Sequence, residues 1–242
     1  MGLSVLILQG DAEALLFAQA ELTLQACFPS AEISVHSAWT TRSDLLGDAA
    51  TDNQAKGGWG KPPISELLAQ PHDLVILSTL PDVALPLWSG PRGRFVVHRG
   101  VAESWSASER SEVEGESSVG AMVDLEAAVE SLQRVIEELM SRGQAVALCN
   151  VFRRVPEPLQ HRVTPGSVSL RRRALAMNLE VAKLSHRTGC FVVDLDRVLA
   201  HEGGAALNAD CFGGGERAEE LALEELVAVV LEALPQATGE HT

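Results

Sequence analysis

The sequence predicts a three-layer α/β sandwich built on a five-stranded parallel sheet with the strand order 2-1-3-4-5. Short runs rich in Val, Ile and Leu alternate along the chain with segments of helical periodicity. The runs are apolar throughout, as expected of strands that helices cover on both faces. Such an alternation favours a parallel sheet with right-handed crossovers, which leaves few other strand orders. The predicted strands are residues 3–9, 33–37, 74–79, 145–151 and 190–195.

Helical periodicity is clearest before the fourth predicted strand and near the C-terminus. Between residues 125 and 139, apolar side chains recur at intervals of three and four, which is the spacing of one helix face. Arg142-Gly143 follows, and a basic last turn before a glycine is typical of a helix end. The second pattern covers residues 223–234 and ends at Pro235. We therefore expect a helix in each of these segments.

Length and composition indicate one domain over residues 1–235, followed by a flexible tail at 236–242. The chain has 242 residues, 46% of them hydrophobic, which suffices for one substantial core. Its formal net charge of −14 would repel a phosphate backbone and argues against a nucleic-acid partner. No apolar run approaches the roughly 20 residues that cross a membrane, and the first residues lack the basic start of a signal peptide. We expect a cytoplasmic protein that does not contact a membrane.

Two stretches interrupt the alternating pattern. Residues 47–63 are rich in Gly, Asp and Asn and predict a loop. Residues 80–120 contain too many Pro, Gly, Ser and Glu residues for a packed element, apart from a short strand at 94–98. A connection of this length is uncommon in a compact domain, so we expect either a lid or a disordered loop. Its least ordered part should be the acidic stretch 102–120.

The cysteines predict neither a metal site nor a redox pair. Cys27, Cys149, Cys190 and Cys211 include no Cys-x-x-Cys pair and have no regular spacing. Two of them fall in predicted strands, where a thiol acts as a small apolar side chain. We expect mostly buried thiols, and no metal or cofactor.

Short motifs stand near both ends of the chain. Gly10-Asp11-Ala12 follows the first strand, and Asp210-Cys211-Phe212-Gly213 precedes the last helix. Between them, a helix carrying Asn178 leads into a strand that ends in Asp194-Leu195-Asp196. In this order and spacing the chain resembles the SGNH, or GDSL-type, ester hydrolases. In that family a serine follows Gly-Asp after the first strand, and a histidine stands three residues after an Asp near the C-terminus.

The resemblance covers most of the chain. It implies a flavodoxin-like three-layer fold with five parallel strands. It also implies a shallow cleft at their carboxyl ends for an ester, acyl or glycan ligand. The family positions in this chain are Asp11, Ala12, Asp210 and Gly213.

The same residues argue against the family's usual chemistry. A serine esterase needs a nucleophile, a base, an orienter for that base, and donors for the oxyanion. The resemblance places Ala12 at the nucleophile and Gly213 at the base, and neither side chain can serve. The glycine donor of the second family block is missing from residues 36–41, where Trp39 stands. The Asn donor of the third block is missing from residues 79–82. Four losses together favour natural degeneration over an engineered serine-to-alanine change.

Other polar residues offer replacement roles, each with a structural alternative. His36 ends the second predicted strand and either acts as a base towards a ligand or is a half-buried strand histidine. Cys211 is a weaker candidate nucleophile, because no histidine is close to it in sequence. Arg153 and Arg154 follow the fourth strand, where they either hold an anionic ligand group or pair with acidic residues. The arginines at 171–173 resemble a solvated helix face.

Two classes of function follow. The first is a non-hydrolytic SGNH-type protein that binds a small acyl- or ester-type ligand, or a partner protein such as an active paralogue. The second is an enzyme with a repurposed cleft, for acyl transfer or a cyclisation in small-molecule biosynthesis. Its acid or base would be Asp11, His36, Asp82 or Asp210. An esterase whose serine was changed to Ala12 is a third reading. The expected ligand-binding positions are Gly10, Trp39, Thr79, Asp82, Arg153 and Arg154.

Overall fold

A computed structural model describes residues 2–9, 16–39, 46, 64–85, 88–90, 93–96, 106–120, 122–151, 169–201 and 216–234. Its main feature is a five-stranded sheet in the order β2-β1-β3-β7-β8, with every adjacent pair parallel. Because β7 and β8 are the fourth and fifth predicted strands, the predicted order 2-1-3-4-5 is confirmed. The strands are β1 (Gly2–Gln9), β2 (Glu32–Trp39), β3 (Leu74–Ser78), β7 (Ala145–Cys149) and β8 (Phe191–Val193).

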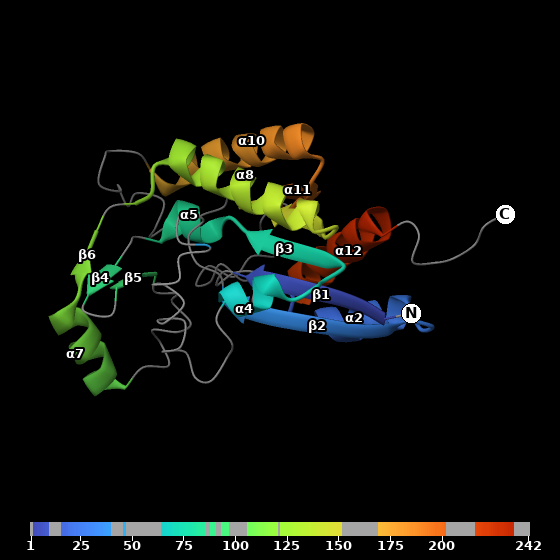
Figure 1. Ribbon diagram of the computed structural model, residues 1–242, viewed down its shortest axis with the longest axis horizontal. Coiled ribbons are helices and arrows are strands. Elements are labelled where there is room, and N and C mark those ends of the chain that lie inside the picture. The colour runs from blue at the N-terminus through green and yellow to red at the C-terminus, as the bar shows by residue number, and fades with distance from the viewer. Residues whose placement is uncertain are drawn as a thin grey trace.

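The apolar runs form central strands because helices cover both faces of the sheet. Residues 5–8 of β1 and 74–76 of β3 are 0% exposed. On one side of the sheet α8 packs against α10, and on the other α12 packs against α2 (Figure 1). The helices are α2 (Ala20–Cys27), α4 (Ile64–Ala69), α5 (Leu80–Ala84), α7 (Ala107–Glu116), α8 (Leu125–Ser141), α10 (Leu170–Thr188), α11 (Leu195–His201) and α12 (Glu216–Ala233).

Local sequence signals set the limits of the long helices. The Asp124 carboxylate caps α8 by accepting the Ala127 N–H, and the Ser169 hydroxyl caps α10 by accepting the Arg172 N–H. At the other end of α8, Gly143 has a φ of 81°, as the sequence predicted for this helix end. Gly189 ends α10 in the same left-handed region, with a φ of 79°. None of the helices that the structure describes is long and apolar enough to cross a membrane.

The stretch 80–120 was expected to hold no packed element, and the structure corrects this. Residues 80–83 of α5 are buried against the core. Further along, β4 (Trp88–Gly90) pairs antiparallel with β5 (Gly93–Phe95) and β6 (Ser118–Val119), and α7 lies beyond them. The sequence did not predict α5, because its five residues show too little periodicity. Its burial comes from contacts with α10 and α8.

The thiols follow the prediction in two of the three described cases. Cys149 and Cys190 are buried, at 1% and 3% exposure, and burial raises the pKa of the Cys190 thiol. Cys27 is exposed, contrary to expectation, because it ends α2, whose buried residues are Ala20 and Leu24. Cys211 lies outside the described residues.

A buried histidine joins three elements at the amino edge of the sheet. His72 precedes β3 and is 5% exposed. Its Nε2 lies 3.0 Å from the Leu67 carbonyl of α4, so Nε2 must donate, and its Nδ1 then accepts from the Ser4 hydroxyl at 2.9 Å. The neighbouring Asp73 carboxylate accepts the Ser4 backbone N–H at 2.7 Å. These contacts tie α4 and β3 to β1.

We expect the free energy of unfolding to fall as the pH drops below about 6.5, partly through His72. Burial lowers the pKa of His72 from 6.5, and the charge of His36 lowers it further, although the Leu67 carbonyl and Asp73 oppose both. The unfolded chain therefore binds more protons at this site, so the stability present above pH 6.5 is lost on acidification. Urea unfolding at pH 7.5 and 5.5 should show a smaller loss for His72→Gln than for the wild type. Equal losses would contradict this account.

Amide hydrogen exchange should be faster in α7 than in the core strands. The described side chains of α7 are exposed, whereas residues 146–149 of β7 are at most 1% exposed. Because α7 buries little apolar surface, it opens at low free energy. Amides of residues 107–116 should therefore exchange at least about 100-fold faster than those of β7, measured by NMR or mass spectrometry. Comparable protection of the two segments would show that α7 belongs to the core.

Candidate functional site

The candidate site is the carboxyl edge of the sheet, where ligands bind in open parallel α/β folds. The strand pairing sets the ends of β1, β3 and β7 side by side at this edge. Of the predicted site residues, the structure describes His36, Trp39, Thr79 and Asp82. The others lie outside the described residues, and their roles stay predictions: Gly10, Asp11, Ala12, Arg153, Arg154, Asp210 and Gly213.

Thr79 links the ends of two strands. It follows β3 and is 0% exposed. Its hydroxyl donates to the Cys149 carbonyl at 2.8 Å, and its N–H donates to the same oxygen at 3.3 Å. Next to it, the Ser78 hydroxyl accepts the N–H of Leu80, the first residue of α5, at 3.1 Å. These bonds hold the ends of β3 and β7 together beyond the last ladder pair, and the predicted ligand role of Thr79 stays a prediction.

Asp82 is also placed in the interior. It lies on α5 and is 1% exposed, so it does not line a cleft in this structure. Its carbonyl, together with that of Val83, belongs to the last turn of α5, where carbonyls lack partners within the helix. Both accept from the guanidinium of Arg173, at 2.8 Å and 3.3 Å.

Arg173 was expected on a solvated helix face, and it is buried. Its exposure is 9%, whereas Arg171 and Arg172 on the same helix are exposed as expected. Besides α5, the guanidinium binds the Val123 carbonyl at 2.8 Å, just before α8. The planar fork therefore joins α5, α8 and α10 through three carbonyls. Sequence alone could not separate one arginine from its two neighbours, because the difference depends on which way the helix faces.

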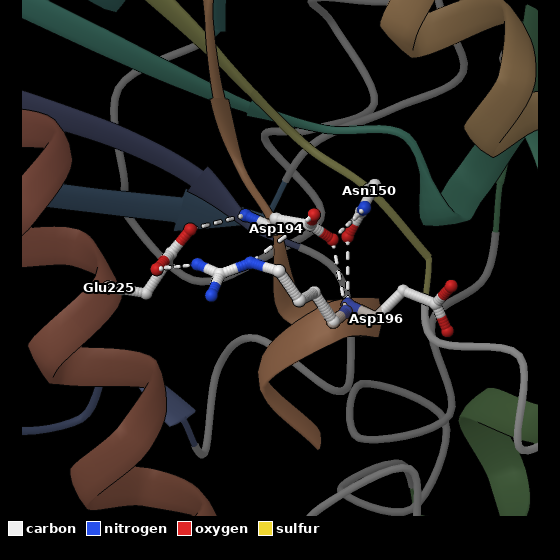
Figure 2. A network of polar contacts seen from close by, with 5 residues as sticks. Asn150, Asp194, Asp196 and Glu225 are labelled. Atoms are coloured by element: carbon white, nitrogen blue, oxygen red, sulfur yellow. Dashed lines mark hydrogen bonds and ion pairs between the residues drawn. The ribbon is translucent and has the colours of Figure 1, made fainter. Parts of the chain in front are cut away.

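An asparagine and an aspartate lock β7 to β8. Asn150 donates its amide N–H to Asp194 Oδ1 at 2.6 Å and accepts the Asp196 backbone N–H at 3.0 Å (Figure 2). Asp194 Oδ1 also accepts the Arg197 N–H at 3.0 Å, so this carboxylate caps α11. Figure 2 shows the Asp196 carboxylate directed away from these bonds. Asp194 and Asp196 belong to the motif that carries the family resemblance, whereas Asn150 directly follows an apolar strand and no sequence signal marks it.

Glu225 extends this network to α12. One of its carboxylate oxygens accepts the Asp194 backbone N–H at 3.2 Å, and the other pairs with the Arg197 guanidinium at 2.6 Å (Figure 2). The Glu225 side chain is 14% exposed, against 66% for Arg197, so the contact to the backbone is the more protected one. The C-terminal helix is thus attached to the end of β8 at the same edge.

Asn178 fixes the point where the chain leaves β7. Its Oδ1 accepts the Val151 N–H at 2.9 Å, and its Nδ2 donates to the Val151 carbonyl at 2.6 Å. The side-chain amide therefore replaces the ladder partner that Val151 lacks beyond the strand. Asn178 was noted in the sequence only as part of the resemblance, and its role here is structural.

His36 does not lie at the strand end as predicted. β2 continues for three further residues to Trp39, which places His36 roughly 10 Å from that end. Its exposed ring lies 5.5 Å from the ring of His72, which precedes β3 at the amino edge. The backbone of Trp39 pairs with Gln9 at the end of β1. The indole itself lies outside the described side chains, so whether it fills the cleft stays a prediction.

The described part of the edge holds no catalytic pair. Its polar side chains bond to backbone groups and to one another, as the preceding contacts show. Among the residues described, no three His, Cys, Asp or Glu side chains gather closely enough to hold a metal ion. A hollow of about 330 Å³ lies at the opposite, amino edge, lined by residues 70–73 and 142–144. It is remote from the strand ends that the family motifs follow.

Solved structures identify the fold. An acetyl xylan esterase, AlAXEase, matches with a TM-score of 0.52 and 14% identity, over 94% of this chain and 100% of that one. The acetylxylan esterase Axe2 from Geobacillus stearothermophilus matches with a TM-score of 0.52 and 15% identity, over 99% and 94%. A protein from Slackia heliotrinireducens, provisionally assigned as an SGNH hydrolase, matches with a TM-score of 0.50 and 15% identity, over 95% and 100%. No family model and no curated protein matches the sequence. The chain has the fold of the SGNH-type esterases.

Replacing the buried arginine should destabilise the fold measurably. Arg173→Met would leave three carbonyls without their donor, which we expect to lower the free energy of unfolding by about 2–4 kcal/mol. Arg172→Met is the matched control, since Arg172 is the exposed neighbour on the same helix, and it should change the value by less than about 0.5 kcal/mol. Urea denaturation of both variants checks this. Similar values for the two would mean that the buried contacts contribute little.

Proposed function

We propose that the protein is a non-hydrolytic member of the SGNH superfamily that binds a small acyl- or ester-type ligand at the carboxyl edge of its sheet. One observation carries the proposal. The chain leaves the central strand β1 at Gln9 and continues as Gly10-Asp11-Ala12, where the family that it resembles has Gly-Asp-Ser. An alanine has no oxygen with which to attack an ester.

The position of β1 supports a ligand site at this point. β1 pairs with β2 on one side and β3 on the other, so its carboxyl end lies between two other strands at this edge of the sheet. Solved esterases with the same fold are similar to this chain over nearly its full length. A cleft retained without its nucleophile would still bind an acyl group through shape and backbone donors.

The second missing side chain points the same way. The base position reads Gly213, three residues after Asp210, so a serine at position 12 would have no histidine to take its proton. Members of a catalytic triad act as a unit, and loss of one removes most of the activity. With both the nucleophile and the base absent, the remaining Asp210 has no histidine to orient. The family's hydrolytic mechanism then has no working residue at this site, which favours binding over hydrolysis.

The alternative of a repurposed enzyme is less well supported. It required carboxylates and His36 to converge on one enclosed pocket. The imidazole of His36 instead faces His72, and the carboxyl group of Asp82 belongs to a residue that is 1% exposed. Two of its four proposed acid-base residues are therefore unsuited to a ligand at the carboxyl edge.

The protein should not hydrolyse p-nitrophenyl acetate or butyrate through an acyl-enzyme. Without a nucleophile and base, any turnover would come from binding and backbone donors alone, so no burst of p-nitrophenol should appear. A fluorophosphonate probe should leave every serine unlabelled. Stoichiometric labelling of one serine, lost when that serine is mutated, would instead identify a working hydrolase with a displaced active site.

Binding is tested separately from hydrolysis. Saturation-transfer NMR with p-nitrophenyl butyrate should detect contact with the wild type, and Ala12→Trp should abolish it by filling the position. Leu22→Trp is the control, because Leu22 is 71% exposed on α2 and lies outside the proposed site. Loss of the signal in Ala12→Trp alone supports the proposal. An unchanged signal in Ala12→Trp would place the ligand elsewhere.

A further inference from the structure

The outer face of α10 combines exposed leucines with basic residues. Leu175 and Leu179 are one helical turn apart and are 43% and 57% exposed. On the opposite face, residues such as Met177 and Val181 are buried against the core. The exposed leucines therefore form a short apolar stripe directed away from the protein.

Charge distinguishes this face from the rest of the chain. The chain as a whole has 19 basic and 33 acidic residues, whereas α10 exposes four Lys and Arg side chains and contains one glutamate. That glutamate, Glu180, pairs with Lys183 at 2.6 Å. Arg171 and Arg172, four and three residues before Leu175, are exposed beside the leucines, and Arg187 is exposed further along the helix. Two arginines in the first turn of a helix are unfavourable towards its dipole, so they are not explained by helix stability.

A surface of complementary charge is formed by α7 and β6. α7 carries four glutamates and one arginine, and Glu116 at its end is exposed. Directly after it, Val119 of β6 is 56% exposed. This surface therefore joins acidic charge to an exposed apolar side chain, the reverse in charge of the α10 face.

Within one chain the two surfaces are kept apart. Figure 1 shows α10 along one side of the molecule and α7 with β6 projecting at one end, below it in that view. α10 is fixed to α8 and α5 by its buried face, and β6 is held by β4. A contact between the two surfaces therefore requires two molecules.

We propose that two copies of the chain associate by docking the α10 face of each onto the α7–β6 surface of the other. A two-fold axis would form this contact twice, which closes the assembly as a dimer. The strongly negative net charge opposes association elsewhere on the surface, whereas opposite charges at this contact favour it and set its register. The leucines and Val119 would supply the apolar centre of each contact.

Light scattering coupled to size exclusion tests the proposal on the full chain. The mass should rise from 25.8 kDa towards twice that value as concentration increases. Leu175→Ser with Leu179→Ser should weaken the dimer by about tenfold or more. Leu22→Ser, at an exposed leucine on α2, should leave it unchanged. A monomer at every concentration, or equal weakening by the Leu22 control, would overturn the proposal.

Charge reversal identifies the occupant. A variant with Arg171→Glu and Arg172→Glu, and another with Glu116→Lys, should each be monomeric because like charges then face each other. Mixed together, they should form a heterodimer, since each reversed surface meets one of opposite charge. Failure to form it, with the wild type still dimeric, would show that α10 does not meet α7. Binding of monomers to phosphatidylserine vesicles through the α10 face would instead assign that face to an anionic membrane and overturn the proposal.

Discussion

The fold depends on satisfying the backbone where buried strands end. A strand covered on both faces by helices carries its polar groups into a region without water, and the ladder satisfies them only as far as its last pair. Beyond that pair the chain needs side chains as partners. Thr79, Asn150 and Asn178 perform this role at the carboxyl edge, each by bonding to a strand end or to the residue that follows it. Without them the exits of β3, β7 and β8 would have no defined positions.

This constraint links the packing of the core to the candidate site. The buried guanidinium of Arg173 binds a carbonyl in the last turn of α5, and the Ser78 hydroxyl accepts the N–H of its first residue. The chain after β3 is therefore held at both ends of one short helix. The third motif block of the SGNH hydrolases corresponds to residues 79–82 of this chain. Thr79 directly precedes α5, and residues 80–82 lie in it. Here the polar groups of that block are directed into the protein. In the part of the edge that the structure describes, the residues of this block therefore hold the chain in place after β3.

Acidic and basic residues are distributed unevenly over the surface elements. The acidic residues keep copies of the chain apart in general, and the basic residues of α10 mark a place where that repulsion is locally reversed. The insertion carries acidic charge beyond the sheet, on elements that the core does not need. The proposed ligand site and the proposed contact between copies are therefore separate, because each uses a different part of the chain.

The sequence by itself determined the sheet and its order, and its resemblance to the esterases predicts that Ala12 and Gly213 stand at the nucleophile and base positions. Runs such as residues 3–9 and 74–79 predict central strands because burial on both faces demands apolar residues at every position. Ala12 and Gly213 are visible in the sequence because chemistry depends on side-chain identity. Only the tertiary structure decided which polar residues are structural. Arg173 is buried while Arg172 is exposed, and His36 faces His72 and not the strand ends, because such differences follow from helix orientation and strand length. The role of Asn150 in joining β7 to β8 is visible only in the structure, because it depends on β8 lying beside β7.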